Sequence, residues 1–179
     1  MPKSIQTPRL ILKPLTQDDF PFLRSLHQSS EVMKYIGSGK PRSEEESKKA
    51  LKASLQIAQD NPLLGSWIAY FNDEPVGNLI LRNPATLTPT RGYEIGYSFI
   101  ETYWGKGFAT EAAKGIMDYT YEVLGAVRLV ALINPENEAS RRTLIKLGFV
   151  PCGFTEYKDP STGLIKPTEI LEIPTPLSD

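Results

Sequence analysis

A hairpin near the middle of the chain is the feature that most constrains the fold. Two apolar segments, 65–71 and 76–81, flank a turn at Asn72-Asp-Glu-Pro75. Strands joined by so short a turn pair antiparallel, because a parallel pair needs a crossover of about a dozen residues or more. A purely parallel, doubly wound sheet is therefore disfavoured.

Further strands and helices surround this hairpin. Ser43 and Glu46 form a capping box that opens a helix, and Asn61-Pro62 ends it. Asn134-Pro135 predicts the start of the last helix. We therefore expect a mixed α/β (α+β) fold with about four helices, in a single domain over residues 1–179. The other expected strands are 9–14, 92–99, 127–133, 150–157 and 168–173, and the other helices start near Thr16 and Phe108.

Composition excludes several classes of protein. The 179 residues are 40% hydrophobic and 23% charged, which is typical of a globular protein. With 20 basic and 21 acidic residues the net charge is -1, so neither nucleic acid nor a membrane is an expected partner. A single cysteine, Cys152, and one histidine exclude an internal disulfide and the usual zinc sites. Without a secretory signal or a membrane-spanning apolar run, we expect a cytoplasmic protein that binds no metal and is a monomer or homodimer.

The segment Tyr103-Trp-Gly-Lys-Gly-Phe-Ala-Thr-Glu-Ala112 lies between a strand and an apolar helix. Two glycines one residue apart let the backbone curl so that successive N–H groups point into one concavity. This concavity opens onto a helix N-terminus, which favours an anion such as a pyrophosphate. The spacing is neither that of a P-loop nor Gly-x-Gly-x-x-Gly. A plain glycine-containing turn before a core helix is the alternative interpretation.

A second polar segment, Asn134-Pro-Glu-Asn-Glu-Ala-Ser140, follows the strand 127–133. Asn137 and Ser140 are three residues apart, so they share a helix face and can both address a ligand beside it. The alternative is that they are ordinary capping or solvated residues.

Taken together, the two segments resemble the motifs of a known protein family. Trp104-Gly-Lys-Gly-Phe-Ala-Thr-Glu-Ala112, Asn137-Glu-Ala-Ser140 and Lys146-Leu-Gly-Phe149 resemble the GNAT superfamily of acetyl-CoA-dependent N-acetyltransferases. Thr7-Pro-Arg-Leu-Ile-Leu-Lys-Pro-Leu15 and Tyr93-Glu-Ile-Gly-Tyr97 look like its RimJ/RimL branch, which acetylates ribosomal-protein N-termini and related substrates. The resemblance extends over roughly residues 7 to 173, in the family's order.

The resemblance implies a mostly antiparallel sheet that splays open between the strands 93–100 and 127–133. Acetyl-CoA would be the cosubstrate, with its pantetheine arm in this opening near Phe99, Ile100 and Glu101, held by Asn137. One departure is Thr102, because the superfamily often has glutamine or arginine there. The backbone cradle does not need that side chain. The pyrophosphate would sit on the amides of Trp104, Gly105, Lys106, Gly107, Phe108, Ala109 and Thr110.

Catalysis needs a base for the attacking amine and an acid for the departing thiolate. Glu94 is the first candidate for the base, because it shares a strand face with the small residues Gly96 and Ser98; an exposed strand carboxylate is the alternative. Glu169 and Glu101 are rival bases. By the resemblance, Ser140 would lie near the thioester sulfur as the acid, with Tyr103 as a rival.

The acceptor pocket is assigned by family analogy alone, to Met33, Tyr35 and Trp67, with core packing as the alternative for Trp67. His27 precedes this segment, and a surface or helix-end position is the first interpretation for it, with a place in the lining of the acceptor pocket as the alternative. We expect an N-acetyltransferase that acts on a primary amine, a protein N-terminus or a small molecule, by direct attack. A non-catalytic CoA-binding regulatory module is the alternative. Cys152 is not expected to act as a nucleophile.

Overall fold

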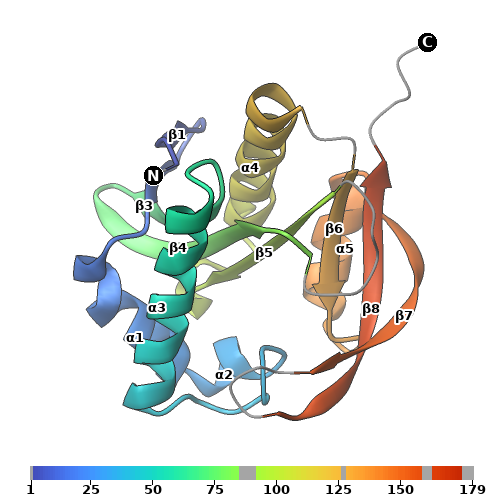
Figure 1. The fold of residues 1–179 in the computed structure, drawn as a ribbon, viewed down its shortest axis with the longest axis horizontal. Helices are drawn as coiled ribbons and strands as arrows, with labels where there is room; N and C mark the ends of the chain where they lie inside the picture. Colours follow the sequence, from blue (N-terminus) through green and yellow to red (C-terminus); the bar gives the residue numbers. More distant parts are fainter. Residues whose placement is uncertain (1, 85–91, 126–127, 159–162, 175–179) are drawn as a thin grey trace.

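The computed structural model describes residues 2–84, 92–125, 128–158 and 163–174. Within these ranges one eight-stranded sheet forms the centre of the molecule (Figure 1). Its strands are β1 (Ile5–Gln6), β2 (Ile11–Pro14), β3 (Gly65–Phe71), β4 (Glu74–Arg82), β5 (Tyr93–Phe99), β6 (Arg128–Ile133), β7 (Val150–Lys158) and β8 (Ile165–Pro174), in the order β1-β2-β3-β4-β5-β6-β8-β7. Only β5 and β6 pair in parallel among these described strands. The predicted mixed, mostly antiparallel class is confirmed.

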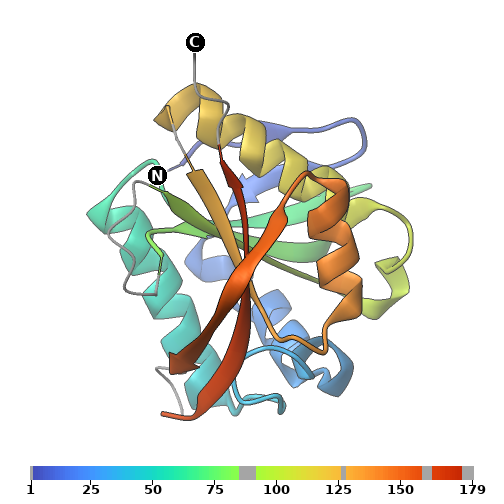
Figure 2. The same ribbon diagram turned by 90° about the vertical axis from the view of Figure 1, so that its right-hand side faces the viewer.

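Helices cover both faces of the sheet, as the two views show (Figures 1 and 2). The described α-helices are α1 (Phe20–Gln28), α2 (Ser30–Met33), α3 (Glu44–Asp60), α4 (Phe108–Leu124) and α5 (Glu138–Lys146), with short 3₁₀ turns η1 (Gln17–Asp19) and η2 (Glu101–Tyr103). Successive side chains of β3 point to opposite faces of the sheet. Trp67 and Ala69 belong to the core cluster that includes residues of α4 and α5. Ile68 instead packs with apolar residues of α1 and α3.

The central hairpin forms where it was predicted. Phe71 pairs with Glu74, so the loop contains only Asn72 and Asp73. Both residues have a positive φ, 50° and 62°, which gives the two-residue turn that matches the twist of antiparallel strands. Asparagine and aspartate tolerate this backbone conformation better than most residues.

Helix boundaries follow local capping signals, with one correction. The Ser43 capping box begins α3, and Gly125, with φ 56°, ends α4. However, the predicted start of the last helix at Asn134-Pro135 is wrong. Asn134 instead begins a turn, accepting from the amide of Glu136 at 2.9 Å, and Asn137 caps α5. An asparagine before a proline forms a turn as readily as a helix cap.

The parallel contact between β5 and β6 is short and fixes the location of the site. Tyr93 pairs with Leu129 and Glu94 with Val130, and the described residues of β5 and β6 form no further pair. Beyond these pairs, β5 remains paired with β4 as far as Phe99, whereas β6 is paired with β8. The expected opening of the sheet is therefore present. No helix among the described residues is long and apolar enough to cross a membrane.

Candidate active site

A cavity of about 550 Å³ lies at the opening of the sheet. One wall comes from β4 and β5, with Glu94, Gly96 and Ser98 facing it, and the opposite wall from β6 and α5. Residues of α1, α2, α3 and the start of β8 line it further. The cavity therefore connects the predicted base, the opening between the strands and the predicted acceptor region. The lining residues include His27, Met33, Tyr35, Ala131, Asn137, Ser140 and Thr168.

The loop before α4 has the geometry expected of an anion cradle. Gly105 and Gly107 have φ values of 73° and 79°, which glycine adopts without strain. No side chain caps α4 at Gly107, and the first helical hydrogen bond runs from the Glu111 amide to the Gly107 carbonyl. The amides of Phe108, Ala109 and Thr110 therefore precede the first intrahelical bond and remain available to a ligand. This arrangement fits a pyrophosphate.

Trp104 differs from the other predicted cradle residues. Its amide donates to the Glu101 carbonyl at 3.0 Å, closing the 3₁₀ turn, so it is engaged within the chain. Its indole N–H donates to the Phe99 carbonyl at 2.7 Å, although half of the residue remains exposed. The Ile100 carbonyl accepts from the amide of Tyr103 at 2.9 Å. Hydrogen bonds within the chain therefore already engage the Trp104 amide and the carbonyls of Phe99 and Ile100, and the amides left for an anion begin at the glycines.

Glu94 is buried beside the cavity and paired with a cation. Its carboxylate lies 2.5 Å from Nη2 of Arg82, directly across the β4–β5 ladder, and 7% of its side chain is exposed. Burial alone would lower the pKa of Arg82, but Glu94 and Tyr157 outweigh this effect, so the pKa is raised and the guanidinium stays charged. Glu94 is therefore a charge-compensated carboxylate beside the cavity.

The two rival carboxylates have other environments. Glu169 on β8 pairs with Nε of Arg141 on α5 at 3.1 Å and does not line the cavity. Glu101 is exposed in η2 and accepts a hydrogen bond from the Ser29 hydroxyl at 2.7 Å. Of the three candidates, Glu94 is the carboxylate that faces the cavity.

Ser140 meets a tyrosine that the sequence interpretation did not select. The Ser140 hydroxyl lies 3.1 Å from the Tyr97 hydroxyl, and its amide donates to Oδ1 of Asn137 at 3.1 Å. Burial raises the pKa of Tyr97, although hydrogen bonds to Ser140 and Thr143 partly oppose this effect. The phenol therefore stays protonated at neutral pH. Tyr103, the rival acid, packs against the ring of Phe108 instead.

The predicted acceptor residues separate in the structure. Met33 and Tyr35 line the cavity, whereas Trp67 does not. Trp67 is fully buried, donates its indole N–H to the Lys3 carbonyl at 2.9 Å and packs edge-on against Tyr119. Trp67 is thus a core residue, because its position in β3 points toward α4. Cys152 is exposed on β7, outside the cavity.

His27 lines the cavity as an uncharged side chain. Its Nε2 lies 3.2 Å from Nη1 of Arg42, and the Arg42 amide donates to the His27 carbonyl at 2.9 Å. Burial, and secondly the charge of Arg42, lower the pKa of His27 to about 4 from 6.5. At neutral pH the imidazole is therefore neutral, and Arg42 provides the positive charge in this part of the wall.

This pKa predicts an acid-sensitive stability. A lowered histidine pKa contributes stability that is fully present above pH 6.5 and is lost as the pH falls toward 4. Between pH 7 and pH 5 the free energy of unfolding should fall by about 2 kcal/mol from this source. His27 is the only histidine, so the His27→Gln variant should lack this component in urea denaturation at the two pH values. Equal pH dependence in both proteins would contradict the assignment.

Comparison with known proteins identifies the family. A model described as the acetyltransferase (GNAT) domain matches residues 9–150. The FsC-acetyl coenzyme A-N(2)-transacetylase of Aspergillus fumigatus is 30% identical over 168 residues, covering 90% of this chain and 72% of the relative. The uncharacterized N-acetyltransferase YoaA of Bacillus subtilis is 28% identical over 176 residues, covering 92% of this chain and 98% of YoaA.

The fold is shared with solved structures. RimL, a ribosomal alpha-N-protein acetyltransferase in complex with coenzyme A, aligns with a TM-score of 0.78 at 17% identity. The alignment covers 96% of this chain and 97% of that chain. The family model spans most of the residues that form the opened sheet and the glycine loop. The chain therefore belongs to the GNAT acetyltransferase family and is an acetyl-CoA-dependent acyltransferase.

Proposed function

We propose that this protein transfers the acetyl group of acetyl-CoA to a primary amine, on a protein N-terminus or a small molecule. One observation carries the proposal: a single cavity joins Glu94 to the opening of the sheet and to Ser140. The glycine loop lies at the start of α4, where an acetyl donor with a pyrophosphate would be held by backbone amides. In this proposal the enzyme works in the cytoplasm, where an exposed thiol such as that of Cys152 stays reduced.

The residues around the cavity account for each proton in the transfer. Bound acetyl-CoA supplies the thioester carbon that the amine nitrogen attacks. Glu94 accepts the proton of the amine, directly or through one water. As the carbon–sulfur bond breaks, the hydroxyl of Ser140 donates a proton to the thiolate, and Tyr97 replaces it through their mutual hydrogen bond. The proton taken up by Glu94 then returns to the Tyr97 phenolate through solvent, which restores both groups. The attack is direct, so no covalent enzyme intermediate forms.

Charges on the cavity wall favour one group of acceptors. Among the described lining residues, four are cationic and two are anionic, while His27 is neutral. This excess of positive charge favours an amine that also carries a negative group, such as a carboxylate, over a polyamine. The charged lining residues are Arg42, Lys49, Arg82, Lys166, Glu46 and Glu94.

Release of free CoA from acetyl-CoA tests the function. The acceptor panel pairs amines that differ only in a carboxylate, such as tyrosine and tyramine, and adds acidic and basic peptide N-termini and spermidine. We expect CoA release that depends on the acceptor and is faster for the carboxylate-bearing member of each pair. Binding of CoA with no release across the panel would instead support a non-catalytic CoA-binding module.

A further inference from the structure

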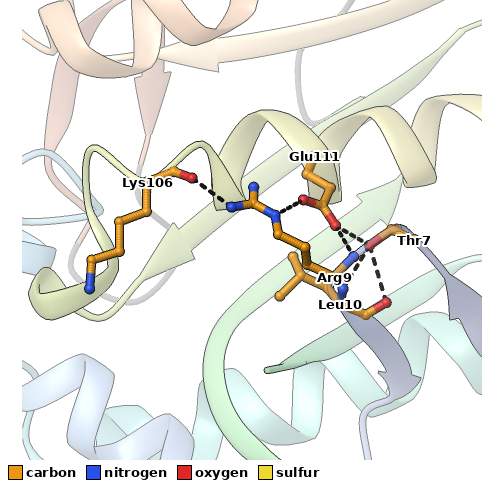
Figure 3. A network of polar contacts seen from close by, with 5 residues as sticks. All are labelled: Thr7, Arg9, Leu10, Lys106 and Glu111. Carbon is orange, nitrogen blue, oxygen red and sulfur yellow. Dashed lines mark hydrogen bonds and ion pairs between the residues drawn. The ribbon is translucent and has the colours of Figure 1, made fainter. Parts of the chain in front are cut away.

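The N-terminal segment between β1 and β2 is fastened to the first turn of α4 (Figure 3). The Thr7 hydroxyl and the Arg9 amide each donate to Oε1 of Glu111 at 2.7 Å. Nε of Arg9 donates to Oε2 of the same carboxylate at 2.6 Å. Both oxygens of Glu111 therefore receive donors from this segment. We call Thr7, Arg9 and Glu111 the N-terminal clamp.

The clamp controls a negative charge next to the anion cradle. Burial alone would raise the pKa of Glu111, but the hydrogen bonds from Thr7 and Arg9 and the charge of Arg9 outweigh it and lower the pKa. Glu111 is therefore ionised at neutral pH, in the helical turn whose amides would meet the pyrophosphate. The guanidinium of Arg9 offsets this charge, which would otherwise repel a bound phosphate.

Arg9 also sets the orientation of the loop backbone. Its Nη1 donates to the Lys106 carbonyl at 3.0 Å, and its guanidinium lies 4.4 Å from the centre of the Phe108 ring. In a planar trans peptide, the carbonyl of Lys106 and the N–H of Gly107 point in opposite directions. Holding the carbonyl toward Arg9 therefore turns the Gly107 amide to the opposite side of the loop, away from the clamp.

We propose that Arg9 is a positioning residue for the pyrophosphate of the cofactor. It orients the peptide between Lys106 and Gly107 and neutralises Glu111, without contacting the reacting atoms. This inference rests on the proposed function, because it requires the pyrophosphate to occupy the glycine loop. Its effect should therefore appear with ligands that contain the pyrophosphate and disappear with ligands that lack it.

The Arg9→Met variant tests this dependence. We expect the Kd for CoA, measured by calorimetry on the unliganded protein, to rise about tenfold, together with the KM for acetyl-CoA. The kcat at saturating acetyl-CoA should change little. With acetyl-pantetheine, which lacks the pyrophosphate, kcat/KM should be the same as in the unmodified protein. Arg9→Lys keeps the charge but loses the forked donor, so its Kd should lie between the other two.

A control on the same helix separates this role from general stability. Lys114 and Asp118 form an exposed ion pair on α4, and Lys114→Met should leave the CoA affinity unchanged. An Arg9→Met variant that binds CoA normally, or that loses kcat/KM equally with both donors, would overturn the inference. If the unmodified protein fails to bind CoA or to prefer acetyl-CoA over acetyl-pantetheine, the proposed function itself fails.

Discussion

The Gly107→Val variant is expected to lose CoA binding by roughly 100-fold or more while keeping the fold. Gly107 caps α4 with a φ of 79°, a backbone conformation that β-branched residues adopt only with strain. Relief of that strain would rotate the peptide and turn the cradle amides away from a common centre. Calorimetric titration with CoA measures the loss, and circular dichroism checks the helix content.

The control for this substitution lies at the other end of the same helix. Gly125 also has a positive φ, 56°, and a Cβ there would meet no atom within 4 Å. Gly125→Val therefore imposes comparable backbone strain on α4 without altering the cradle. We expect it to lower stability but to leave CoA affinity unchanged. An equal loss of affinity in both variants would show that helix strain, not the cradle, is responsible.

Replacement of Glu94 by glutamine should lower kcat by about 100-fold, because a positioned general base typically contributes this much or more. The KM for acetyl-CoA should change by less than about twofold, since Glu94 lines the cavity and is not part of the glycine loop. Glutamine has the shape of glutamate and can still accept a hydrogen bond from Arg82. Steady-state kinetics with varied acetyl-CoA and varied amine separate these parameters.

Glu169 provides a closely matched comparison. It is also 7% exposed at its side chain and paired with an arginine, Arg141, but it lies outside the cavity. Glu169→Gln thus removes a similar buried ion pair and should reduce stability without a comparable fall in kcat. The reverse result, with a normal kcat in Glu94→Gln and a low kcat in Glu169→Gln, would transfer the role of base to Glu169.

Features encoded by neighbouring residues were predicted well from the sequence. The hairpin turn at Asn72 and Asp73 and the ends of α3 and α4 depend on short capping and turn signals, and the structure has them where expected. The start of α5 was misplaced because two nearby asparagines, Asn134 and Asn137, both carry a capping signal. The structure assigns the turn to the first and the helix cap to the second.

Contacts between segments far apart in the sequence could not be predicted from these local signals. The pairing of Arg82 with Glu94 follows from the β4–β5 register, which the sequence does not specify across the long connection between the strands. Tyr97 lies within the predicted strand 92–99, but its contact with Ser140 depends on where α5 packs. The placement of β8 between β6 and β7 likewise follows from tertiary pairing. Cross-strand pairing of opposite charges is the signal that would have suggested Arg82.

The indole of Trp104, held by its hydrogen bond to the Phe99 carbonyl, provides an intrinsic fluorophore beside the glycine loop. The chain has two tryptophans, and they occupy opposite environments. Trp67 is sealed in the core, while Trp104 is half exposed beside the glycine loop. With excitation selective for tryptophan, a change in fluorescence when CoA is added is therefore expected from Trp104, and Trp104→Phe should remove it. Cofactor occupancy can thus be followed during turnover without an attached dye.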